Sequence, residues 1–139
     1  MLEHEALSKA IIGAAIEVHR HLGPGLLESA YELCLHDELS RAGLGVRRQV
    51  ELPLEYKGRR LDCGYRLDLI VESAVIVEVK TVERFDPIHE AQMLTYLRLT
   101  GCSLGLLLNF HRATMLEGLK RVVLANQKSL ISAPSASSR

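Results

Sequence analysis

The segment from Leu104 to Phe110 constrains the fold of this chain more than any other. It is almost entirely apolar, yet it is too short to cross a bilayer. A strand of this composition is typical of the centre of a sheet that is covered on both faces. A helix is predicted just before it, from Asp86-Pro87 to about Thr100, because Asp is a favoured N-cap and Pro suits the first helical position. A helix between two strands usually makes them parallel, so we expect the strand at 104–110 to be parallel to a neighbour.

The remaining segments alternate between helical and strand-like periods. Apolar residues recur at helical spacing over Leu7–Leu22 and Leu26–Ala42, and Gly23-Pro24-Gly25 separates the two helices. The second helix is expected to face the core with Leu27, Ala30/Tyr31, Cys34/Leu35 and Leu39. Apolar and polar residues alternate from Val50 to Tyr56, which indicates a strand. Further strands are expected, in chain order, at Leu61–Val71, Ala74–Thr81 and Leu119–Leu124. This order predicts an α/β fold in which helices flank a mixed β-sheet.

The length of 139 residues fits one domain. We expect residues 1–128 to form this domain and residues 129–139, which are small and polar, to be a flexible tail. Lys plus Arg number 17 and Asp plus Glu number 17, so the formal net charge is zero. This balance excludes a protein whose whole surface attracts nucleic acid, and such a contact must come from a local patch. Aromatic residues make up 4%, which disfavours a protein that binds single strands by base stacking.

The cysteines and the N-terminus bear on the location of the protein. Cys34, Cys63 and Cys102 are odd in number and contain no CxxC pair, which argues against a disulfide framework and against a structural zinc site. The first five residues are acidic and do not resemble a signal peptide, and no apolar run is long enough to span a membrane. We therefore expect a cytoplasmic protein that has no membrane partner.

Two apolar strands carry charged residues that need an explanation. Asp68 lies among aliphatic residues, and Glu78 and Lys80 share one face of the next strand because they are two residues apart. A short turn can bring Asp68 beside Glu78, and two adjacent carboxylates suit a hard cation such as Mg²⁺. The alternative is a set of cross-strand ion pairs on a solvated face, in which Arg66 simply pairs with Asp68.

Three further positions carry polar groups at helical spacing. Gln92 and Tyr96 share one helix face, although Tyr is usually a core residue and Gln beside it usually lies at the rim. Glu28 lies at the start of the second helix, where a Glu often caps its own helix and complements the helix dipole. A different alternative concerns basic residues: Arg47-Arg48 and the cations near Lys57 could form a basic edge that contacts phosphate, or a solvated strand edge guarded by charge.

The segment Gly25-Leu26-Leu27-Glu28-Ser29-Ala30-Tyr31 has the form GxxExxY. The chain resembles the GxxExxY proteins, a branch of the PD-(D/E)xK nuclease superfamily, from about Ile11 to Val123. Further blocks carry the resemblance: residues 13–19, Leu22-Gly23-Pro24-Gly25, Tyr65-Arg66-Leu67-Asp68, Val77-Glu78-Val79-Lys80 and residues 89–97. The resemblance implies a restriction-endonuclease-like core of helix, three strands, helix and strand.

The resemblance also implies roles for individual residues. Asp68 and Glu78 match the two acids that bind Mg²⁺ or Mn²⁺, and Lys80 matches the lysine of the ExK motif. Glu28 matches the acid of the first core helix that reaches the metal directly or through water. The residue before Asp68, often Pro in the superfamily, is Leu67 here.

Gln92 and Tyr96 match a QxxxY motif that lies near the substrate strand in RecB-like members. The implied function is that of a hydrolase, a metal-dependent nuclease that binds nucleic acid, with DNA as the expected form. The alternative is a non-catalytic nucleic-acid-binding or accessory module that keeps the nuclease fold. The sequence leaves the oligomeric state open and is compatible with a homo-oligomer.

Overall fold

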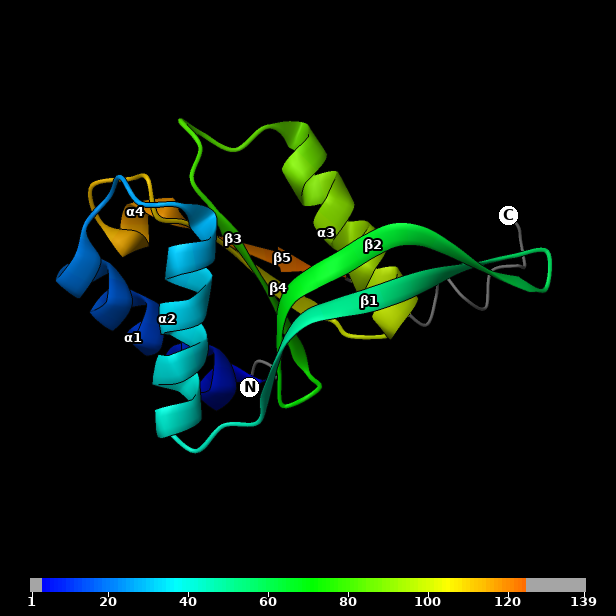
Figure 1. Ribbon diagram of the computed structural model, residues 1–139, viewed down its shortest axis with the longest axis horizontal. Helices are drawn as coiled ribbons and strands as arrows, with labels where there is room; N and C mark the ends of the chain where they lie inside the picture. Colours follow the sequence, from blue (N-terminus) through cyan, green and yellow to red (C-terminus); the bar gives the residue numbers. More distant parts are fainter. Residues whose placement is uncertain (1–3, 125–139) are drawn as a thin grey trace.

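The computed structural model describes residues 4–124 (Figure 1). Its elements, in chain order, are α1 (Glu5–Leu22), α2 (Glu28–Arg41), β1 (Val46–Tyr56), β2 (Arg59–Val71), β3 (Val75–Lys80), α3 (Pro87–Thr100), β4 (Leu104–Asn109), α4 (Met115–Gly118) and β5 (Leu119–Val123). The predicted α/β fold with a mixed sheet flanked by helices is confirmed. The predicted tail at 129–139 and the predicted domain boundary at residue 128 lie outside the described residues.

The sheet has the strand order β1-β2-β3-β4-β5. β3 and β4 are parallel, with Val77 opposite Leu106, and the other neighbours are antiparallel. The predicted parallel strand after the α3 crossover is therefore confirmed, and all six residues of β4 are buried. Gly105 on β4 allows α3 to approach the sheet closely, because a Cβ at this position would overlap the Met93 side chain.

Two apolar cores lie on the two faces of the sheet. Alternate residues of β3 divide between them, so Val77 and Val79 pack with residues of α1 and α2, whereas Ile76 packs with residues of α3. In Figure 1, α1 and α2 lie on one side of β3 and β4, and α3 lies on the other side. The central strands are thus covered on both faces, which accounts for their continuous apolar sequences.

Some sequence predictions of element bounds and burial were wrong. α2 begins at Glu28 rather than Leu26, and its N-cap residue Leu27 has 77% of its surface exposed. Cys34 is exposed as well, while α2 buries Glu32 beside Tyr31. β1 begins at Val46 rather than Val50, because its first residues pair with the end of β2.

The β1–β2 hairpin extends well beyond the rest of the sheet (Figure 1). β2 pairs with β1 along most of its length but with β3 only from Leu69 to Val71. The turn at the far end contains Lys57 and Gly58, both with positive φ, 49° and 78°. Because the pairing with β3 begins only at Leu69, β2 separates from β3 at the residue before it, Asp68.

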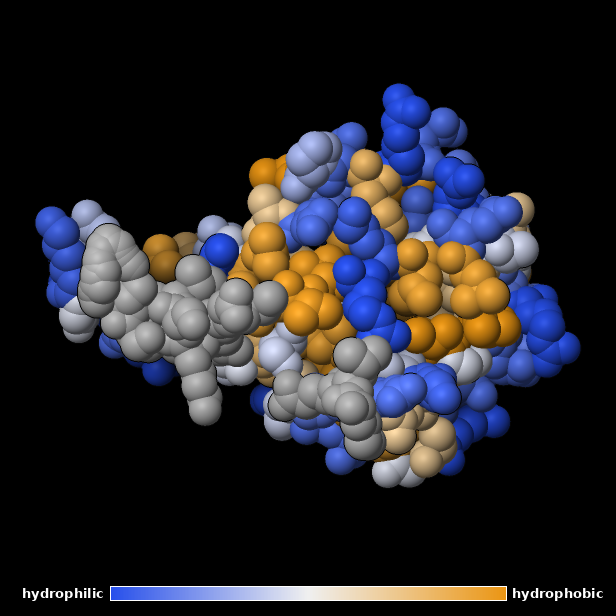
Figure 2. Space-filling model, turned by 180° about the vertical axis from the view of Figure 1, so that it is seen from behind, coloured by the Kyte–Doolittle hydropathy of each residue, from blue (hydrophilic) through white to orange (hydrophobic). Residues whose placement is uncertain are grey.

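The surface seen from behind shows two apolar areas divided by a band of hydrophilic atoms (Figure 2). Exposed large apolar side chains of the described residues include Leu116 on α4 and Val123 on β5. In residues 4–124, no helix is both long enough and apolar enough to cross a membrane.

Candidate active site

Asp68 and Glu78 lie side by side where β2 and β3 separate. The last backbone pair of this ladder is Leu69 with Val77, and beyond it the side chains take over the hydrogen bonds. The Asp68 backbone N–H donates to Glu78 Oε2 at 2.9 Å, and the Val79 N–H donates to Asp68 Oδ2 at 2.9 Å. The short turn thus brings the two carboxylates together, as the spacing predicted.

Each of these carboxylates has one oxygen left for another partner. Asp68 Oδ1 and Glu78 Oε1 accept no hydrogen bond from any residue in the described range 4–124. Glu78 is only 4% exposed, and burial together with the neighbouring Asp68 raises its pKa to about 8. Burial also raises the pKa of Asp68 to about 6. The pair therefore holds protons more tightly than ordinary carboxyl groups and gains from a cation.

Positive charge near the pair comes from Lys80. Its charge lowers the pKa of both Asp68 and Glu78, against the larger effect of burial. Within residues 4–124, Lys80 forms no ion pair or hydrogen bond through its side chain. Arg66 pairs instead with Glu51 at 3.2 Å, so the simple Arg66–Asp68 ion pair is not formed.

Glu28 comes from the helix layer and reaches the end of β3. Its Oε2 accepts hydrogen bonds from the Thr81 N–H at 3.0 Å and from the Thr81 hydroxyl at 3.4 Å. No side chain caps the N-terminus of α2, so Glu28 does not cap its own helix, but as the acidic residue of the first turn it still complements the helix dipole. The charge of Glu28 raises the pKa of Asp68, which means that the two groups lie within electrostatic reach of each other.

Tyr96 approaches from the opposite helix, α3, which also carries Gln92. Tyr96 is 4% exposed, packs edge-on against Tyr65 at 5.9 Å, and has its hydroxyl 3.5 Å from the carbonyl oxygen of Arg66. Burial and the nearby charges of Glu78 and Asp68 raise the pKa of Tyr96 to about 12. Gln92 is half-buried one helical turn earlier. Tyr96 thus reaches β2 from the α3 side, and Glu28 reaches the end of β3 from the α2 side.

The chemistry of the Asp68–Glu78 pair fits a divalent ion. Two hard oxygen donors, each with a free oxygen, are the kind of ligands that Mg²⁺ and Mn²⁺ use together with water. No group of three or more His, Cys, Asp or Glu side chains in residues 4–124 is arranged to hold a metal ion. Glu28, already bound to Thr81, would therefore contribute through a water molecule or after a small rearrangement.

Sequence reasoning missed Glu32, one helical turn after Glu28. Its side chain is 5% exposed, and its carboxylate accepts hydrogen bonds from Arg48 Nε at 3.0 Å and from Gln49 Nε2 at 2.9 Å. Its negative charge raises the pKa of both Asp68 and Glu78. The i, i+4 spacing from Glu28 was the signal in the sequence that could have indicated this residue.

Two buried residues fix the loops around the site. The Tyr31 hydroxyl donates to the Gly23 carbonyl and accepts from the Leu26 N–H, so it holds the loop that precedes Glu28. The Asn109 side-chain amide donates to the Val82 carbonyl at 2.7 Å, and its oxygen accepts from the Val82 N–H at 3.1 Å. Tyr31 of the GxxExxY segment therefore fixes the loop between Gly23 and Leu26, which precedes Glu28.

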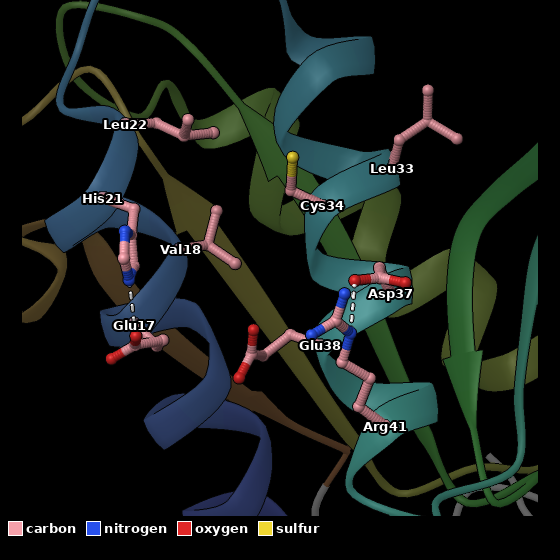
Figure 3. A pocket seen from close by; sticks show the side chains of 9 residues that line it. All are labelled: Glu17, Val18, His21, Leu22, Leu33, Cys34, Asp37, Glu38 and Arg41. Carbon is pink, nitrogen blue, oxygen red and sulfur yellow. Dashed lines mark hydrogen bonds and ion pairs between the residues drawn. The ribbon is translucent and has the colours of Figure 1, made fainter.

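A hollow of about 360 Å³ lies between α1 and α2 (Figure 3). Its lining combines apolar side chains, among them Val18 and Leu33, with acidic groups such as Glu38. Arg41 pairs with Asp37 at 2.9 Å at its rim. None of the six residues predicted for the site lines this hollow.

Comparison with known proteins identifies the superfamily that this architecture resembles. The sequence model of the PD-(D/E)XK nuclease superfamily matches residues 5–122. Among solved structures, the crystal structure of SSO0001 is similar, with a TM-score of 0.51 and 15% sequence identity over 93% of this chain and 84% of that chain. No curated protein matches the sequence significantly. At this identity, the structural similarity supports the fold alone.

Proposed function

Because this chain belongs to the PD-(D/E)XK nuclease superfamily, we propose that it hydrolyses phosphodiester bonds of nucleic acid with a divalent metal ion. The observation that carries the proposal is the pair of Asp68 and Glu78, adjacent and each with one free oxygen. Burial raises the pKa of both carboxyl groups, and the neighbouring Asp68 raises that of Glu78 further, so the pair is suited to a cation rather than to a solvated sheet face.

Asp68 and Glu78 would hold Mg²⁺ or Mn²⁺, and Glu28 would contribute directly or through water. The ion would supply a water of lowered pKa and neutralise charge that develops on the phosphate. Lys80 adds a fixed positive charge beside the carboxylates, which suits it to hold a phosphate oxygen.

Tyr96 and Gln92 would bind and orient the substrate strand. With a pKa of about 12, the Tyr96 phenol keeps its proton across the neutral pH range. It can therefore donate a hydrogen bond but cannot act as a general base near neutrality. Gln92, one turn away on the same helix, offers an amide that can both donate and accept hydrogen bonds.

Within this proposal, the substrate is DNA and the protein is a GxxExxY-type nuclease of the cytoplasm. The balanced overall charge requires that contact with DNA come from a local surface or from a partner, and a second copy of the chain in a homo-oligomer is one such partner. A single domain over residues 1–128 remains part of the proposal.

A second candidate function is a nucleic-acid-binding or accessory module without catalysis. The observation that favours it is that the Glu28 carboxylate already binds Thr81, which leaves two rather than three free acids. The two candidates differ in one measurable property, because both bind nucleic acid but only the first cleaves it.

The test is a cleavage assay with Mn²⁺ on a panel of single- and double-stranded DNA and RNA, combined with calorimetric titration of MnCl₂. We expect the wild type to bind Mn²⁺ and to cleave, and Asp68→Ala to do neither. Asp62→Asn, on the exposed part of the same strand, is the matched control and should behave as the wild type. Binding of DNA without cleavage would favour the accessory module. A wild-type protein that neither binds Mn²⁺ nor cleaves any substrate of the panel would overturn the nuclease proposal.

A further inference from the structure

Gln49 of β1 has an unusual backbone conformation at a critical position. Arg48 pairs with Leu69 and Val50 pairs with Leu67, so Gln49 stands directly opposite Asp68. The φ angle of Gln49 is +53°, in the left-handed region that residues other than glycine seldom adopt. A strained residue therefore faces the predicted metal-binding acid across the hairpin ladder.

The hairpin changes sheet face at this same pair. Leu69 packs in the core below α1 and α2, but Leu67, two residues earlier, packs in the core below α3. The partner strand does the same, since Val46 packs with the first core and Val50 with the second. In a regular strand, alternate residues stay on one face, so both strands must twist through the positions of Gln49 and Asp68.

Glu32 binds the residue at which this twist occurs. Both of its carboxylate oxygens lie 2.9 Å from Gln49 Nε2, and Oε2 lies 3.0 Å from Arg48 Nε. Consecutive side chains of a regular strand point to opposite faces, whereas those of Arg48 and Gln49 both reach the same carboxylate on α2. Because that carboxylate is buried, its charge-assisted hydrogen bonds are protected from competing water.

The twist of the two strands sets the direction of the Asp68 side chain. At the change of face, the Asp68 side chain points to neither core but along the sheet toward β3, where Oδ2 meets the Val79 N–H. We propose that Glu32 is a positioning residue: by binding Arg48 and Gln49 it holds Gln49 in the left-handed conformation, and this turns the Asp68 carboxylate toward Glu78. The inference deepens the proposed function, on which it rests for the statement that Asp68 takes part in catalysis.

Two substitutions of Gln49 separate backbone conformation from side-chain contact. Gln49→Gly and Gln49→Ala both remove the bond to Glu32, but only glycine adopts a φ of +53° without strain. We expect Gln49→Gly to keep the amides of Asp68 and Val79 protected from hydrogen exchange, and Gln49→Ala to lose that protection. In the cleavage assay, Gln49→Ala should lower kcat about tenfold or more with little change in KM, because misplaced catalytic groups cost rate.

Glu32→Gln tests the other half of the interaction. It should lower protection of the same two amides and lower kcat, and the double variant Glu32→Gln/Gln49→Gly should recover most of both. Asp37→Asn is the control, since it removes an exposed acid from the same helix. If Glu32 acted only through its charge, Glu32→Gln would shift the pH profile of kcat, and glycine at position 49 would not restore the rate.

The outcomes separate this inference from the proposed function. If Glu32→Gln lowers the protection of the Asp68 and Val79 amides and the added Gln49→Gly restores it, the positioning role is supported even if no variant cleaves nucleic acid. In that case the proposed function alone fails. The positioning role is overturned if Gln49→Ala and Gln49→Gly behave alike, or if Glu32→Gln leaves both amides protected.

Discussion

The backbone N–H of Asp68 lies 2.9 Å from the carboxylate of Glu78, and the Asp68 carboxylate in turn accepts the N–H of the residue after Glu78. These two bonds occupy the place of the next rung in the β2–β3 ladder, so each acid is fixed by the backbone of the other strand. The arrangement holds the two carboxylates together, and Lys80 supplies positive charge near both.

The stability of the metal-free protein should depend on pH in an unusual direction. The pKa of Asp68 rises from 3.8 to about 6 and that of Glu78 from 4.5 to about 8 on folding. A raised pKa in the folded state means that the folded state binds protons more tightly, so stability is fully present below the unfolded pKa values. It should fall as pH rises from about 4 to 8. Urea unfolding in EDTA across this range measures it, and a rise of stability with pH would contradict the prediction.

Asp68→Asn should make the metal-free protein as stable as the wild type or more stable. The substitution removes one of two repelling charges but keeps an oxygen that can accept the Val79 N–H. We expect a Tm increase of up to about 4 °C, the shift that about 1 kcal/mol produces in a domain of this size. Cleavage should be lost. A lower Tm for Asp68→Asn than for the control Asp62→Asn would indicate that Asp68 has a structural ion partner instead.

Divalent metal should reverse the repulsion in the wild type. Mn²⁺ at about 100 times its Kd stabilises a protein by about 2.7 kcal/mol if it binds only the folded state. Thermal melts at pH 7.5 with and without Mn²⁺ measure this shift, and Ca²⁺ offers a comparison with a larger hard ion. Asp68→Asn should lose most of the shift. An equal Tm shift in the wild type and in Asp68→Asn would mean that the metal binds at a site that does not include Asp68.

Glu28→Gln should weaken metal binding while leaving the fold unchanged. The amide oxygen can still accept the Thr81 N–H, so the expected change in unfolding free energy is below about 0.5 kcal/mol. We expect the Kd for Mn²⁺ to rise about tenfold, the lower end of the effect of losing an outer partner of a metal site. Glu38→Gln, on the same helix, is the control and should bind Mn²⁺ as the wild type does.

Tyr96→Phe should reduce cleavage more than stability. The hydroxyl lies 3.5 Å from the Arg66 carbonyl, a long contact that contributes little to folding, so we expect less than about 1 kcal/mol of destabilisation. Cleavage should fall, because the phenol donates to substrate in the proposed mechanism. Tyr65→Phe removes the neighbouring hydroxyl and serves as the comparison. Parallel losses of Tm and rate in Tyr96→Phe would mean that this tyrosine is purely structural.

The parts of the fold that the sequence predicted are those governed by local pattern. The apolar run of β4 and the Asp86-Pro87 helix start predicted that β4 is parallel to a neighbour, which in the structure is β3. The placement of Asp68 beside Glu78 followed from strand alternation and one short turn. The Asp68–Glu78 contact lies within one hairpin, and the β3–β4 pair follows from a single helical crossover between consecutive strands.

The parts that the sequence did not predict depend on contacts between distant segments. Buried Glu32 binds Arg48 and Gln49 of a distant strand, whereas the local sequence pattern places Arg48 on a basic or charge-guarded strand edge. The left-handed conformation of Gln49 has no local signal, since a glycine or asparagine would be expected there. Leu27 matched the apolar period of α2 but lies before its first turn, where the helix does not yet face the core.

The hydrogen bonds of the site also differ in how far they reach along the chain. Asp68 and the Glu78 carboxylate are ten residues apart within a hairpin, whereas Glu28 and Thr81 are 53 apart. Hairpins close in about 1–10 μs, while contacts between distant segments must first bear the entropy of closing a long loop. During folding, the two acids therefore meet early and Glu28 arrives late. Because burial is the main cause of the raised pKa values, we expect the two acids to become costly to ionise together only when the helix layers cover the sheet.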